Sequence, residues 1–165
     1  MNCVREAEKY LWHYRDLKKC LSNGKKQIDI LISASAPKGI GGSNLGGEIY
    51  RKGNGGTLND LYQLARWRQI VDETKGELNR LDEIFAELEE MFVVNGSVIM
   101  ICEADGAERP LTYREFLCLW YVERCRKDKI AERLNYSERS LYRLRDQAIQ
   151  KFAIQLFGLA ALRAV

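Results

Sequence analysis

The chain has 165 residues, with 26 basic and 23 acidic side chains and a net charge of +3. Residues 1–56 hold 10 basic and 5 acidic side chains, residues 57–110 hold 5 and 12, and residues 111–165 hold 11 and 6. Two basic ends around an acidic middle favour a polyanionic partner. A hydrophobic content of 46% excludes a disordered chain.

Several other classes are also disfavoured. The longest uncharged run has 12 residues, at 91–102, which is too short for a membrane span, and the first residues lack a signal-peptide pattern. The five cysteines contain no Cys-x-x-Cys pair, so we expect reduced thiols in a cytoplasmic protein without a membrane partner. With one histidine and no suitably spaced pair of carboxylates, we expect no enzyme, no cofactor and no metal site.

The N-terminal residues 1–92 are predicted to form a helical hairpin or coiled coil. One stripe of a helix, with spacings of three and four, is formed by Ala7, Tyr10, Tyr14, Leu17 and Leu21. Asn23-Gly24 interrupts the stripe, so the helix either stops there or continues with a bend into residues 25–35. Residues 37–56 hold 8 of the 13 glycines and lack a Gly-Lys-Ser/Thr ending, which indicates a loop rather than a phosphate cradle.

The clearest helical period covers residues 57–92, with Thr57 as the expected N-cap. Its spacings alternate between three and four at Leu64, Trp67, Val71, Thr74, Leu78, Leu81, Phe85, Leu88 and Phe92. A long helix with so narrow an apolar stripe needs a partner. Either the N-terminal segment folds back antiparallel onto it, or a second copy of the chain binds it in a homo-oligomer.

A linker is predicted at residues 93–110, between the helical half and the C-terminal domain. Asn95-Gly96 separates two short apolar runs, which is a β-hairpin signal. A short helix through residues 97–102 is the alternative, and we favour the hairpin.

Residues 111–165 are predicted to form a helix-turn-helix domain. Thr112 and Glu115 match a capping box, which places the start of a first, mostly buried helix. A basic stretch follows, and then Ile130, Ala131 and Leu134 give the inner face of a short helix. Asn135-Tyr136 provides a tight turn, and Ser137 is the N-cap of the next helix. The inner face of that helix holds Leu141, Leu144, Ala148 and Phe152. Two helices joined by so short a turn are typical of helix-turn-helix proteins.

The start of the second helix of this pair is expected to enter the major groove of double-stranded DNA. There an arginine can bond guanine O6 and N7 in bidentate fashion. The expected base-facing residues are Glu138, Arg139, Tyr142 and Arg143. A second set is expected to contact phosphates and so fix the register on the duplex. It consists of Arg124, Arg126, Lys127, Lys129, Ser137 and Arg145.

Residues 127–152 resemble region 4 of bacterial sigma factors, whose pattern is Ile-Ala-x-x-Leu, a turn, Ser, and a helix ending Ala-Leu-x-Lys-Leu/Phe. The matching residues are Ile130, Ala131, Leu134, Ser137, Leu141, Leu144 and the run Ala-Ile-Gln-Lys-Phe at 148–152. The chain departs from that pattern at Glu138, Arg139 and Tyr142, where sigma factors usually carry Arg, Glu and Arg. The promoter element that sigma factors read is therefore not the expected target.

The whole layout resembles the RinA/ArpU-type late-gene transcription regulators of phages of Gram-positive bacteria, in which such a module binds DNA upstream of late operons. The resemblance implies a sequence-specific DNA-binding regulator, an activator of phage late genes that acts with host RNA polymerase in the host cytoplasm. Two alternatives stay open. One is a small terminase-like DNA-packaging subunit, and the other is a coiled-coil protein-binding scaffold.

Overall fold

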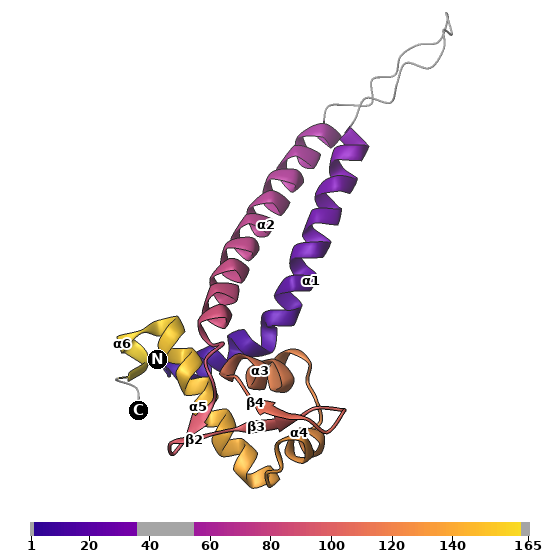
Figure 1. Ribbon diagram of the computed structural model, residues 1–165. Helices are drawn as coiled ribbons and strands as arrows, with labels where there is room; N and C mark the ends of the chain where they lie inside the picture. The colour runs from indigo at the N-terminus through magenta and orange to yellow at the C-terminus, as the bar shows by residue number, and fades with distance from the viewer. Residues whose placement is uncertain (1, 36–54, 163–165) are drawn as a thin grey trace, which may run out of the picture. The chain divides into compact units, whose positions relative to one another are not determined.

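The structure is a computed structural model that describes residues 2–35 and 55–162. Over these residues the chain is mainly helical, as predicted, with two long helices in its N-terminal half and two small β-hairpins (Figure 1). The described residues pack as two units, one formed by Met1–Asp16 with Leu78–Val165 and the other by Leu17–Glu77. The sequence-based division at residue 92 differs, because the start of α1 packs with the C-terminal part of the chain. The glycine-rich loop predicted at 37–56 lies outside the described residues except for its last two, which begin a helix.

Within Leu17–Glu77, the later part of α1 (Cys3–Ser35) and the first part of α2 (Gly55–Glu87) lie side by side and run in opposite directions (Figure 1). The helix does not stop at Asn23-Gly24, as one of the two expectations had it, but continues through both residues. Gly24 is buried, and a Cβ atom added there would lie 2.6 Å from Val71 Cγ2 on α2. The glycine is therefore a packing site between the two helices rather than a helix end.

This packing gives a stability prediction with a matched control. Gly24→Ala should destabilise the protein, because overpacking costs about 1–3 kcal/mol and the higher helix propensity of alanine returns only about 1 kcal/mol. Gly76→Ala should instead stabilise it by about 1 kcal/mol, because a Cβ added at Gly76 meets no atom within 4 Å. Urea unfolding of both variants measures the difference, and a Gly24→Ala variant as stable as Gly76→Ala would contradict the close approach of the helices.

In the other unit, the first turns of α1 bury a stripe that differs by one residue from the predicted one. Leu11 is 1% exposed and Tyr14 is 7% exposed, whereas Tyr10, which was expected in the stripe, is only half-buried. The last turns of α2 supply Phe85, whose ring centroid lies 5.1 Å from that of Tyr14 and 5.7 Å from that of Phe152. The start of α1, the end of α2 and the C-terminal helix α5 therefore share one core.

The second long helix begins at Gly55, so Thr57 lies inside it and is not its N-cap as predicted. It ends at Glu87, not at Phe92 as the apolar spacing predicted. Leu88 and Phe92 are both fully buried, so the spacing reports burial correctly beyond the helix end. The Phe92 N–H donates to Leu111 O at 2.7 Å, and Phe92 O accepts from the Ile99 N–H at 2.8 Å. These long-range backbone hydrogen bonds hold Phe92 outside the helix. The spacing of apolar residues along the sequence cannot reveal hydrogen bonds to residues so far away in the chain.

Two β-hairpins follow. β1 (Val93–Val94) and β2 (Ser97–Val98) pair antiparallel around Asn95 and Gly96, whose φ values of 50° and 80° suit a tight hairpin turn. The alternative helix through residues 97–102 is not what the structure has. β3 (Met100–Cys102) and β4 (Glu108–Pro110) form a second antiparallel hairpin that the sequence analysis did not anticipate.

The remaining chain is helical. α3 (Tyr113–Leu117) is capped by Thr112, whose side chain accepts from the Glu115 N–H at 3.1 Å, as the capping box predicted. A π-helical turn η1 (Cys118–Val122), α4 (Lys127–Leu134), α5 (Glu138–Phe157) and the short α6 (Leu159–Leu162) complete the described chain. Among the described helices, none has the length and the apolar character that a membrane crossing requires.

Candidate nucleic-acid interface

The helices α4 and α5 are joined by a short turn whose geometry follows from its local sequence. Asn135 ends α4 in the left-handed conformation, with φ of 54°, and its backbone N–H bonds Ala131 O and Glu132 O. Ser137 begins α5, and its Oγ accepts from the Ser140 N–H at 3.2 Å. Asparagine tolerates a positive φ better than most residues. Asn135 and Ser137 therefore determine the geometry of the turn between α4 and α5.

The two helices pack through the inner faces that the sequence predicted. On α4, Ile130 is 2% exposed and Leu134 is 3% exposed. On α5, the buried inner residues are Leu141, Leu144, Ala148 and Phe152. The opposite face of α5 is therefore left to solvent over its first turns.

That solvent-facing side carries the four residues expected to face bases: Glu138, Arg139, Tyr142 and Arg143, all of which are exposed. Within the described part of the chain, no hydrogen bond or ion pair engages the side chains of Arg139 and Arg143, so both guanidinium groups are available for a ligand. Tyr142 differs from them. Its hydroxyl accepts a hydrogen bond from Lys127 Nζ at 2.7 Å, and its ring meets the edge of Trp120 with centroids 5.6 Å apart.

The residues expected to contact phosphate fall into several groups. Lys127 and Arg145 lie together against the rings of Trp120 and Tyr142, with the Arg145 guanidinium carbon 5.3 Å from the Tyr142 centroid. Arg145 also pairs with Asp146 at 2.7 Å. Ser137 is exposed but its hydroxyl already caps α5, and Lys129 is exposed on α4.

The two remaining basic residues of that set have intramolecular partners. Arg126 pairs with Asp128 at 2.7 Å in the first turn of α4. The Arg124 guanidinium lies 5.5 Å from the Trp12 ring centroid and donates to Trp12 O at 3.2 Å. Arg124 has a positive φ of 54°, which helps to direct the chain from η1 into α4. Arg124 therefore connects this region to α1 and is the phosphate candidate that the structure supports least.

The turn η1 carries two aromatic residues, Trp120 and Tyr121, which contact neighbouring helices on the side of the protein interior. Trp120 contacts Tyr142 of α5, as described above, and the next residue, Tyr121, contacts α1. The Tyr121 hydroxyl donates to Glu8 at 2.9 Å, and its ring meets Trp12 edge-on with centroids 5.0 Å apart. Trp120 belongs to the segment that the sequence predicted as a mostly buried helix, but its contacts with the basic side chains could not be predicted, because those partners lie on other helices.

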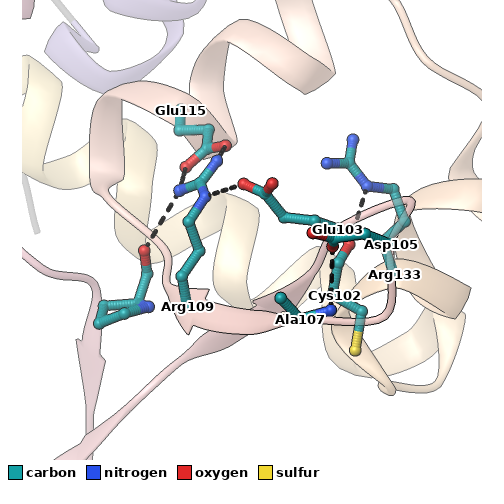
Figure 2. Close-up of polar contacts among 8 residues, drawn as sticks. Cys102, Glu103, Asp105, Ala107, Arg109, Glu115 and Arg133 are labelled. Carbon is teal, nitrogen blue, oxygen red and sulfur yellow. Dashed lines mark hydrogen bonds and ion pairs between the residues drawn. The ribbon is translucent and has the colours of Figure 1, made fainter.

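The β3–β4 hairpin braces the helices next to it, as Figure 2 shows. Arg109 on β4 bonds both carboxylate oxygens of Glu115 on α3 and also contacts Glu103. The hydrogen bonds that Arg109 donates to Glu115, and to a smaller extent those to Glu103, hold the pKa of Arg109 above its ordinary value. From α4, Arg133 donates to Cys102 O at 3.4 Å. The hairpin is thus tied to α3 through Arg109 and to α4 through Arg133, although sequence reasoning took this region as a linker.

In the part of the chain that is described, no three or more His, Cys, Asp or Glu side chains are grouped so that they could hold a metal ion. The five cysteines, all of them described, form no disulfide with one another. No protein-family model, no curated protein and no solved structure matches the chain.

Proposed function

We propose that the chain is a sequence-specific DNA-binding transcriptional regulator, in which α4 and α5 form a helix-turn-helix and the start of α5 enters the major groove. One observation carries the proposal. Arg139 and Arg143 project from the exposed face of α5 without a partner among the described residues, directly after a tight turn that packs α5 on α4. Two such arginines, one helical turn apart, suit bidentate bonding to guanines.

The charge around this surface supports a nucleic acid over a protein partner. Lys127, Lys129 and Arg145 lie on the same two helices and can neutralise phosphates beside the groove. By its resemblance to sigma factor region 4 and to the late-gene regulators of phages, we propose further that the chain activates late genes together with host RNA polymerase in the host cytoplasm. The following experiment separates a regulator from a DNA-packaging subunit and from a protein-binding scaffold.

The test is direct binding to duplex DNA, using fragments selected from a random pool and an unrelated duplex of equal length. The chain should bind the selected duplex more tightly, and its association constant should fall steeply with salt, because phosphate binding releases counterions. A scaffold would bind neither duplex. Light scattering on the free chain completes the test, since a monomer or dimer fits a regulator and a large ring fits a packaging subunit.

A further inference from the structure

The Lys127–Tyr142 contact bears on how the proposed interface works, and this inference rests on the proposed function. We infer that Lys127 and Tyr142 together bind one phosphate of the DNA backbone, and that Tyr142 does not read bases. Sequence reasoning had placed Tyr142 among the base-facing residues. In the structure, Tyr142 differs from Arg139 and Arg143 because its side chain contacts Lys127 and Trp120.

The pair bridges the two helices. Lys127 is the first residue of α4, and Tyr142 lies in the second turn of α5. Their side chains meet at 2.7 Å, from Lys127 Nζ to the Tyr142 hydroxyl, and both residues are exposed. A ligand that contacted both side chains would therefore contact α4 and α5 at once, as a backbone phosphate beside the groove must do when it fixes the orientation of a recognition helix.

The Tyr142 ring is held in place by its neighbours. Trp120 is only 6% exposed and packs edge-on against Tyr142 from the protein interior. Lys127 Nζ lies 4.8 Å from the Tyr142 centroid, and the Arg145 guanidinium lies 5.3 Å from it. Cations so close to an aromatic face are attracted to it. For Tyr142 to turn into the groove and reach a base, it would have to give up these contacts.

The hydrogen-bonding capacity of the pair fits an anion. The Lys127 ammonium has three donors and uses one on Tyr142. The Tyr142 hydroxyl accepts that bond, so its own proton is free for donation to another group. Two donor groups, the Lys127 ammonium and the Tyr142 hydroxyl, and one positive charge thus converge on one place between α4 and α5. A phosphate offers acceptor oxygens and a negative charge, and a base edge offers no net charge.

The experiment measures the affinity of Tyr142→Phe and Lys127→Gln for the selected duplex and for the unrelated duplex over a range of salt. Tyr142→Phe should weaken binding to both duplexes by the same factor, about tenfold, with the salt dependence unchanged, because it removes an uncharged donor. Lys127→Gln should also weaken both equally and should lower the slope of log affinity against log salt by about one. Tyr136→Phe is the matched control, because Tyr136 is 38% exposed, close to the 37% of Tyr142, and lies in the turn beside it.

The outcomes separate this inference from the proposed function. If Tyr142→Phe changes the preference between the two duplexes, Tyr142 reads bases and the inference is wrong. It is also wrong if Tyr142→Phe weakens binding no more than Tyr136→Phe does. In both cases the proposed function as a DNA-binding regulator remains supported if the unsubstituted chain binds the selected duplex more tightly than the unrelated one. If the unsubstituted chain binds neither duplex, both proposals are overturned.

Discussion

Replacing Arg139 and Arg143 together with alanine should remove most of the preference of the chain for its selected DNA. A bidentate arginine–guanine pair is worth about 1–3 kcal/mol of discrimination, so the loss should approach the weak affinity for unrelated DNA. The fold should not change, because both side chains are exposed and have no polar contact within the described residues. Competition binding against unrelated duplex DNA measures the effect.

A control with the same loss of charge distinguishes base reading from general electrostatics. Arg66 and Arg68 are also exposed, and they lie two residues apart on α2. Replacing them with alanine should leave the preference between selected and unrelated DNA unchanged. If Arg139→Ala/Arg143→Ala keeps that preference as well, α5 is not the recognition helix.

The second large effect is a loss of stability above pH 10. Burial, a hydrogen bond to a carboxylate and the charge of that carboxylate raise the pKa of Tyr14 and of Tyr121 well above the ordinary tyrosine value near 10. Asp82 is the carboxylate for Tyr14, and Glu8 is the carboxylate for Tyr121. Both phenols are therefore strongly favoured in their neutral form in the folded protein.

The direction of the pH effect follows from proton binding. Below pH 10 both tyrosines are protonated in the folded and in the unfolded chain, so their contribution to stability is fully present. Above pH 10 the unfolded chain releases these protons while the folded chain retains them. The free energy of unfolding should then fall by about 1.4 kcal/mol per pH unit for each tyrosine, up to the folded-state pKa.

Urea unfolding between pH 8 and pH 11.5 (roughly one and a half units beyond the ordinary tyrosine pKa) measures this slope. Tyr121→Phe should be less stable at pH 8, because Glu8 loses its hydrogen bond, but its stability should fall about half as steeply above pH 10. Tyr14→Phe should behave in the same way. Equal slopes in the original chain and in the double Phe variant would show that neither buried hydroxyl controls alkaline stability.

The parts of the fold that the sequence predicted correctly depend on neighbouring residues. The cap of α3 needs only Thr112 and Glu115, three positions apart, and the turn into α5 needs only Asn135 and Ser137. Apolar spacing predicted which residues of α4 and α5 are buried, because one face of a helix is defined by spacings of three and four. Such features are visible in any short window of the chain.

The errors come from contacts that join distant segments. The spacing that runs to Phe92 did not reveal that α2 ends at Glu87, because the competing hydrogen bond comes from Leu111. At Asn23-Gly24 the sequence left open whether the helix stops or continues, and only the closeness of Gly24 to Val71 shows that it is a packing site. The β3–β4 hairpin was missed because its register is fixed by pairing between strands of only three residues each, which carry little periodicity.

The sequence by itself determined the short-range features of this protein: its mainly helical class, the caps of α3 and α5, the turn between α4 and α5 and the exposed position of Arg139 and Arg143. The tertiary structure decided what each polar side chain meets. Arg124 contacts Trp12 across 112 positions, and Tyr121 contacts Glu8 across 113. Lys127 and Tyr142 meet only because α4 and α5 pack above Trp120. The physical reason is that caps and helical faces depend on local backbone geometry, whereas the partner of a long side chain depends on where the whole chain folds.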